Sequence, residues 1–114
     1  MHETAVAEGI YLAIQAEAEK QQGRPVSAKI SCGILNAVND EILRFAFEAI
    51  TKETECEGMV LEIEHKAMRG KCKVCGYEYD IELDKSGCPS CGSEEIELLP
   101  DAPLILETIE FDTE

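Results

Sequence analysis

The fold of this chain is decided by two short segments, Cys-Lys-Val-Cys-Gly at residues 72–76 and Cys-Pro-Ser-Cys-Gly at residues 88–92. Each segment places two thiolates on one tight turn, and two facing turns can complete a tetrahedral shell of four sulfur ligands. Cys72, Cys75, Cys88 and Cys91 therefore predict one bound metal ion. Because four protein ligands leave no open coordination position, the metal is expected to be structural and not catalytic.

The two turns also resemble those of rubredoxin, an iron electron carrier, since each CxxC pair is followed by a glycine that permits a positive φ. Two features favour zinc over iron. The twelve residues between the pairs are far fewer than the long loop of a rubredoxin, and the chain has no tryptophan to build an aromatic core around iron. Tetrahedral sulfur geometry itself suits both metals.

Residues 67–99 differ in character from the segments on either side, and Pro100-Asp101-Ala102-Pro103 marks a boundary. They contain both cysteine pairs, a short β-hairpin pattern at residues 77–83 and a turn at residues 84–87. We therefore expect an inserted zinc-ribbon domain at 67–99. The rest of the chain, 1–66 and 100–114, is expected to form one α/β domain.

The α/β part has alternating signals for helices and strands. A helix is predicted from a cap at Thr4 to about Gln22, ended by Gly23, and a second helix from a cap at Asn39 with Asp40 in its first turn. Period-two patterns predict strands at 26–32 and 59–64, and a strand at 104–111 is expected to pair with 59–64. The predicted fold class is α+β, with two helices packed on a small three-stranded sheet and an inserted four-cysteine zinc ribbon.

Charge and composition limit the possible partners and compartment. The net charge is −14, so the surface repels phosphate backbones and no nucleic-acid partner is expected. No apolar run approaches the ~20 residues of a membrane span, and no signal peptide is visible. Metal-type cysteine spacing favours a cytoplasmic protein. Of the two remaining cysteines, Cys32 is expected in the core and Cys56 as an incidental thiol in a polar loop.

The amino-terminal sequence Met1-His2-Glu3 has chemistry of its own. The α-amine, the amide nitrogen of residue 2 and the His2 imidazole can chelate one cation in adjoining small rings. Such a nitrogen-rich set favours Ni(II) or Cu(II). The alternative is a solvated side chain at a frayed end.

Taken in order, several motifs resemble the HypA/HybF family of nickel metallochaperones in [NiFe]-hydrogenase maturation. These are Met1-His2-Glu3 before an amphipathic helix, the segments at 33–38, 43–48 and 57–63, and the two cysteine pairs. The resemblance covers nearly the whole chain, and the motifs together are specific although none is decisive alone.

The resemblance implies a nickel-binding α/β domain with an inserted zinc ribbon. His2 would be the essential nickel ligand, helped by the backbone nitrogens of Met1 and His2, with Glu3 as a neighbouring ligand. Some members add an acidic side chain at the start of the second helix; that position falls at Asn39 here, and Asp40 is the nearest acidic candidate. His65 matches no ligand position of the family and is expected to be a polar edge residue.

The same resemblance implies that Cys72, Cys75, Cys88 and Cys91 bind structural Zn(II). It also implies two partners, a HypB-type GTPase and the [NiFe]-hydrogenase large subunit, to which Ni(II) would be delivered.

Two other functions stay open from the residues alone, a rubredoxin-like electron-transfer module and a zinc-ribbon adaptor for protein interactions. An enzyme is not expected, since the chain has no evident nucleophile–base set and no phosphate loop.

Overall fold

The central strand of the larger sheet is β1 (Arg24–Gly33), which pairs with β2 (Val60–Lys66) in parallel and with β6 (Ile105–Asp112) in antiparallel orientation. The strand order is therefore β2-β1-β6. The expectation that the last strand pairs with residues 59–64 is wrong. The strand at 24–33 lies between the two and carries the buried side chains of Ala28, Ile30 and Cys32.

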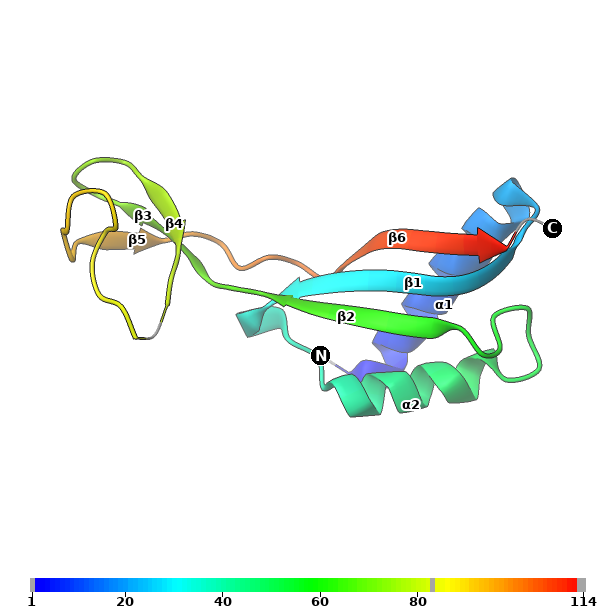
Figure 1. Ribbon diagram of the computed structural model, residues 1–114. Coiled ribbons are helices and arrows are strands. Elements are labelled where there is room, and N and C mark those ends of the chain that lie inside the picture. Colours follow the sequence, from blue (N-terminus) through cyan, green and yellow to red (C-terminus); the bar gives the residue numbers. More distant parts are fainter. Residues whose placement is uncertain (1, 83, 113–114) are drawn as a thin grey trace.

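Two helices cover one face of this sheet, as Figure 1 shows for α1 (Glu3–Gln21) and α2 (Asp40–Thr51) in the computed structural model, which describes residues 2–82 and 84–112. The cap of α2 at Asn39 is confirmed, since its Oδ1 accepts a hydrogen bond from the Ile42 N–H at 3.0 Å. The cap of α1 is not Thr4 but His2, whose side chain makes no capping bond. Gln22, with φ 54°, adopts the left-handed conformation that was expected of Gly23.

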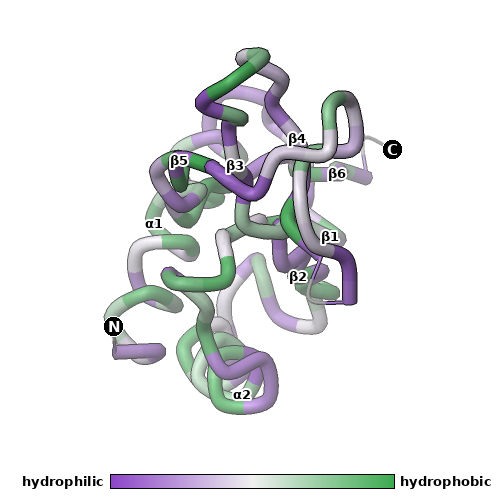
Figure 2. Tube along the Cα trace, turned by 90° about the vertical axis from the view of Figure 1, so that its left-hand side faces the viewer, coloured by the Kyte–Doolittle hydropathy of each residue, from purple (hydrophilic) through white to green (hydrophobic). Residues whose placement is uncertain are grey.

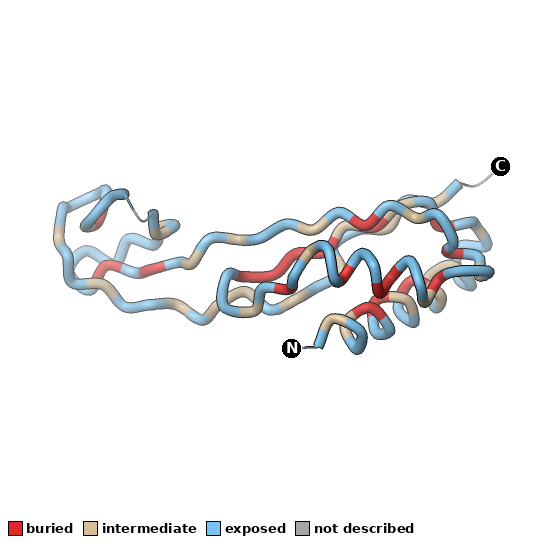
Figure 3. Tube along the Cα trace, turned by 90° about the horizontal axis from the view of Figure 1, so that it is seen from below, coloured by how far each residue is buried: buried red, intermediate tan, exposed pale blue. Residues whose placement is uncertain are grey.

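One hydrophobic core lies between the helices and the sheet, seen as buried segments in Figure 3. Its members come from α1 (Ala7, Ile10, Ile14), β1 (Ala28, Ile30, Cys32), α2 (Leu43, Ala46, Phe47) and the segments around them (Val38, Cys56, Leu61). On α1, Ala13 is exposed and Ile14 is buried. Val26 is also exposed, since a register shift between Pro25 and Ser27 turns it away from the core.

Hydrophobic and hydrophilic residues alternate along the tube of α2 in Figure 2. Leu43 and Phe47 are buried, while Phe45 stays 76% exposed and does not widen the apolar face. The two cysteines outside the pairs are both fully buried. Cys32 is in the core as expected, but Cys56 is not a surface thiol: burial, with a smaller contribution from Glu55, raises its pKa to about 11.

The second sheet lies at the other end of the molecule, which measures 54 × 27 × 19 Å (Figure 1). Its strands are β3 (Arg69–Cys72), β4 (Glu78–Asp80) and β5 (Ile96–Leu98), in the order β4-β3-β5 with both pairings antiparallel. The fold class predicted from the sequence is thus confirmed: two helices, a three-stranded sheet and a smaller four-cysteine unit. Leu83, predicted in the hairpin, lies outside the described residues.

The two ends are joined by segments that touch at Asp101. Its Oδ2 accepts hydrogen bonds from the Leu35 N–H at 2.9 Å and from Asn36 Nδ2 at 2.7 Å, both in the short helix η1 (Ile34–Asn36). The carboxylate occupies the space beside Gly33, where any Cβ would overlap it. The returning chain is therefore fixed to the end of β1. Among the described residues, no helix has the length and apolar character needed to cross a membrane.

Candidate metal centres

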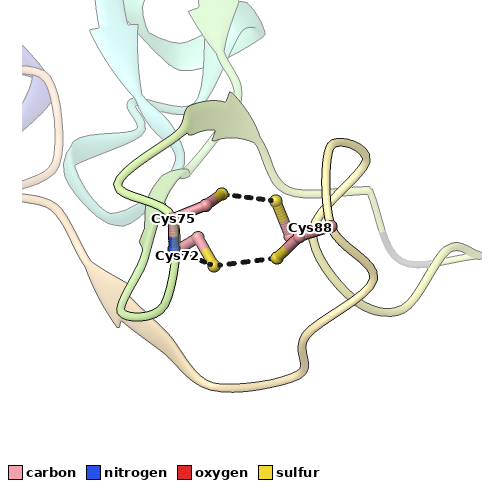
Figure 4. Close-up of side chains that lie close together, drawn as sticks. Cys72, Cys75 and Cys88 are labelled. Carbon is pink, nitrogen blue, oxygen red and sulfur yellow. Dashed lines mark hydrogen bonds between the residues drawn. The ribbon is translucent and has the colours of Figure 1, made fainter.

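The structure brings the four predicted cysteines together at one point, with all four sulfur atoms within 4.8 Å of one another. The Sγ atoms of Cys72 and Cys91 are 3.5 Å apart, and those of Cys75 and Cys88 are 3.6 Å apart (Figure 4). Zinc–sulfur bonds of about 2.3 Å in a tetrahedron put the sulfur atoms roughly 3.8 Å apart. The cluster is therefore close to the size that a bound tetrahedral metal requires.

Both turns point backbone N–H groups at sulfur. Cys72 Sγ accepts from the N–H groups of Val74 and Cys75 at 3.4 Å, and Cys88 Sγ accepts from the Ser90 N–H at 3.3 Å. Gly76 and Gly92 allow this geometry, because their φ values of 79° and 80° turn the chain sharply after each pair. Such bonds stabilise thiolates, which are the form that binds metal.

The pKa values of the cysteine thiols in the cluster are shifted in opposite directions. The N–H groups of Cys75 and Val74 lower the pKa of Cys72 to about 6. The Ser93 N–H acts to lower the pKa of Cys91, but its contacts with the other three thiols, together with burial, raise it to about 12. Four thiolates cannot coexist this closely without a cation, so a divalent ion is the species that completes the cluster. The donor set fits a structural metal.

The amino-terminal residues lie at the start of α1. His2 has an extended backbone, with φ −89° and ψ 121°, and its carbonyl accepts the Val6 N–H at 3.1 Å. Its exposed side chain borders a groove of about 520 Å³ between α1 and the start of β6, lined by Leu104 and Leu106. Met1, the other predicted contributor of nitrogen ligands, lies outside the described residues.

The Glu3 side chain reaches across to the second helix. Its Oε2 accepts a hydrogen bond from the Asn39 N–H at 3.1 Å, and this bond lowers the pKa of the Glu3 carboxyl. Asp40, the weaker nickel candidate, is the next residue and the first of α2. The structure therefore brings Glu3 and the Asp40 segment together, although they are far apart in the sequence.

Asp40 has a partner that sequence reasoning missed. Its Oδ1 lies 2.7 Å from Nε2 of His65, near the end of β2, and His65 Nδ1 lies 3.7 Å from the Cys32 sulfur. His65 is an exposed residue on an edge strand, as expected, and it has these two contacts in addition. Parallel pairing of 24–33 with 60–66 sets Cys32 opposite His65, but this register is not evident in the sequence, so no local signal could have found these contacts.

The two candidate centres differ in whether their ligand atoms already lie close together. Within the described residues, the cysteine cluster is the one group of three or more His, Cys, Asp or Glu side chains whose ligand atoms already converge. His2, Glu3 and Asp40 do not form such a group. An amino-terminal cation would therefore depend on backbone nitrogen atoms and on side chains that leave their present partners.

The chain matches the family model "Hydrogenase/urease nickel incorporation, metallochaperone, hypA" over residues 1–111. It is 36% identical over 115 residues to the hydrogenase maturation factor HypA of Syntrophus aciditrophicus, with 100% of each chain covered. It is 34% identical over 113 residues to that of Azotobacter vinelandii, covering 98% of this chain and 100% of that one.

Solved structures share the fold. The solution structure of the nickel metallochaperone HypA from Helicobacter pylori matches with a TM-score of 0.65 at 23% identity, over 100% of both chains. A second HypA solution structure matches with a TM-score of 0.71, also at 23% identity, over 100% of this chain and 98% of the other. A full-length match of this kind does not suit a rubredoxin-like carrier, and the chain belongs to the HypA family of nickel-incorporation metallochaperones, which are not enzymes.

Proposed function

We propose that this protein binds one Ni(II) ion at its amino terminus, holds a structural Zn(II) in its cysteine cluster, and delivers the nickel to the large subunit of a [NiFe]-hydrogenase during maturation. Membership of the family supports the general role. The observation that carries the site is the bond from the Asn39 N–H to Glu3, which joins the residue after His2 to the helix end that bears Asp40.

In this proposal the His2 imidazole and the backbone nitrogens of Met1 and His2 chelate Ni(II), and Glu3 and Asp40 supply carboxylate oxygen. The exposed position of His2 supports release, because an acceptor can reach the ion and exchange ligands one at a time. Affinity alone would favour Cu(II) over Ni(II). Selection of nickel then depends on partners and on metal supply.

The Zn(II) assignment rests on the four thiolates and on the closed shell that they form. We propose that residues 67–99 form the zinc-ribbon domain and that 1–66 with 100–114 form the nickel-binding domain. The ribbon would set the orientation in which partners meet the nickel site, since the Asp101 contacts tie its return segment to the end of β1.

The proposed partners are a HypB-type GTPase and the hydrogenase large subunit, in the cytoplasm. A net charge of −14 supports docking to basic protein surfaces. The names of the relatives, all hydrogenase maturation factors, support a hydrogenase as the client.

The test is a Ni(II) titration by calorimetry on tag-free, zinc-loaded protein, beside His2→Ala and Glu3→Gln. We expect one nickel site per chain, lost in His2→Ala with zinc retained. Glu3→Gln keeps an oxygen that can accept the Asn39 N–H, so the fold should be unchanged while nickel affinity falls roughly tenfold. Equal nickel binding by the wild type and His2→Ala would contradict the amino-terminal site.

A further inference from the structure

Each of the two histidines of this chain is linked to the start of α2, one of them through its neighbour, although 62 residues separate them in the sequence. His2 precedes Glu3, whose carboxylate accepts the Asn39 N–H at 3.1 Å. His65 contacts the carboxylate of Asp40, the first residue of α2, at 2.7 Å. The residue after His2 and His65 itself therefore contact adjacent residues at the start of α2.

The imidazole of His65 is fixed on its inner side and open on its outer side. Nδ1 faces the sulfur of Cys32 at 3.7 Å, and Cys32 is fully buried. Nε2 faces Asp40, and the side chains of His65 and Asp40 are 38% and 36% exposed. The ring thus presents one nitrogen atom, beside a carboxylate oxygen, at a surface that a cation can reach.

Stability alone gives little reason for this contact. Exposed ion pairs of this kind contribute little to folding. Asp40 already lies in the first turn of α2, where the helix dipole favours a carboxylate without help from a histidine. Asn39 supplies the cap of the same helix. The arrangement is therefore better suited to holding something between the two side chains.

We propose that His65 is a further ligand of Ni(II), binding through Nε2 beside Asp40, so that the cation of the amino-terminal site has two imidazole ligands. The inference rests on the proposed nickel site and adds a residue to it. Imidazole and carboxylate both suit Ni(II). With metal–ligand bonds of about 2.1 Å, adjacent ligand atoms lie roughly 3.0 Å apart, so Nε2 and Oδ1 need to separate by only a few tenths of an ångström.

Nickel bound between Nε2 and Oδ1 would replace their direct contact, while Nδ1 would stay beside the Cys32 sulfur. The change occurs where the chain leaves the larger sheet, because β2 ends at Lys66 and β3 begins at Arg69. Nickel bound through His65 would therefore be attached directly to the strand that leads into the cysteine unit.

The experiment is Ni K-edge X-ray absorption, which counts imidazole ligands, with calorimetry on the same tag-free, zinc-loaded full chain. His65→Gln is the informative variant: its amide N–H can still donate to Asp40, but a neutral amide is a poor nickel ligand. We expect two imidazoles per nickel in the wild type and one in His65→Gln, with affinity reduced roughly tenfold. Glu64→Gln, on the same strand and paired with Lys29, is the matched control and should keep both imidazoles.

One imidazole in the wild type, unchanged in His65→Gln, would overturn the proposal. If His65→Gln kept full affinity and an unaltered spectrum, His65 would act at most by positioning Asp40, and the proposal would again fail. His2→Ala separates this failure from that of the proposed function. Loss of binding in His2→Ala with one imidazole in the wild type leaves the amino-terminal site standing without His65. Full binding with an unaltered spectrum in His2→Ala removes the amino-terminal site and the His65 proposal together.

Discussion

The candidate metal ligands at the two ends of this molecule are arranged in opposite ways. In the cysteine cluster, four sulfur atoms already converge within 4.8 Å, and backbone N–H groups are aimed at two of them. At the amino terminus, two of the candidate ligands already contact other residues: Glu3 contacts Asn39, and Asp40 contacts His65.

This difference distinguishes a site that retains its metal ion from a site that can transfer it. A closed, preorganised shell binds tightly and exchanges slowly, because no ligand position is free for a competitor. A site whose ligands must first break contacts with other residues binds its cation less tightly. When the cation leaves, each ligand can form its earlier contact again. Under the proposed function, the same chain would thus keep one metal and hand over another.

The largest expected effect comes from opening the closed shell. Cys88→Ser should remove most of the zinc, because a serine hydroxyl or a water is a much weaker ligand than the thiolate it replaces, and structural zinc contributes roughly 10–16 kcal/mol in zinc-finger peptides. Metal analysis should fall from one zinc per chain to nearly none. Hydrogen exchange should show residues 67–99 unprotected while the larger sheet remains protected.

Cys56→Ala is the matched control for that variant, since Cys56 is a buried cysteine outside the cluster. It should lower overall stability and leave one zinc per chain. Full zinc content in Cys88→Ser would contradict the closed four-cysteine shell. Simultaneous loss of both sheets would show that the two ends are not separable.

A smaller effect is expected at the contact that joins the two ends. Gly33→Ala should displace the Asp101 carboxylate, because the added Cβ would overlap it, and should cost about 1–3 kcal/mol of unfolding free energy. Urea unfolding followed by circular dichroism measures this loss. Zinc content should not change, since the four cysteines lie in the separate second sheet unit, beyond the segments that join the two ends (Figure 1).

Asp101→Ala distinguishes overlap from other effects of the alanine. In the double variant the overlap is absent, so Gly33→Ala should cost much less there than in the wild type. An equal cost in both backgrounds would mean that the Asp101 side chain is not what the new methyl group meets.

The smallest effect concerns the larger sheet alone. Glu107 Oε1 accepts a hydrogen bond from the Ser31 hydroxyl at 2.6 Å and pairs with Lys66 at 3.3 Å; these two contacts lower the pKa of Glu107 below 4.5. A lowered folded-state pKa stabilises the folded protein above the unfolded value, and the contribution is lost as the pH falls through the folded value. Glu107→Gln should therefore reduce stability slightly at neutral pH.

The measurement is the difference in urea midpoint between the wild type and Glu107→Gln across pH. The difference should be constant at neutral pH and shrink as the pH falls below 4.5. Zinc content should be equal in both proteins throughout. A difference that grew toward acid pH would have the wrong sign and would refute this account of Glu107.

Much of the fold was predictable because its signals are local. The cysteine pairs specify their own turns, and Asn39 followed by Asp40 specifies the start of α2 from three or four neighbouring residues. Alternation correctly identified Ala28, Ile30 and Cys32 as the buried side of β1. The family resemblance added His2, Glu3 and Asp40 as nickel ligands, and this assignment stays a prediction.

The errors are of a different kind, because they concern contacts between distant segments. Periodicity identifies a strand but not its neighbour, so the pairing of β6 with β1 was missed. The burial of Cys56 depends on how its loop packs on the core, and the polar residues around it indicated the opposite. The contact between His65 and Asp40 requires both the register of β2 and the position of α2, and neither was known from the sequence.

The strand order has a consequence for the order in which the protein folds. β6 follows the cysteine unit in the chain but pairs with β1, and the bond from Ser27 to Glu110 spans 83 positions. Contacts so distant in sequence form slowly. The four cysteines all lie within residues 72–91, so the cysteine unit can close on a metal ion while the larger sheet still lacks its third strand.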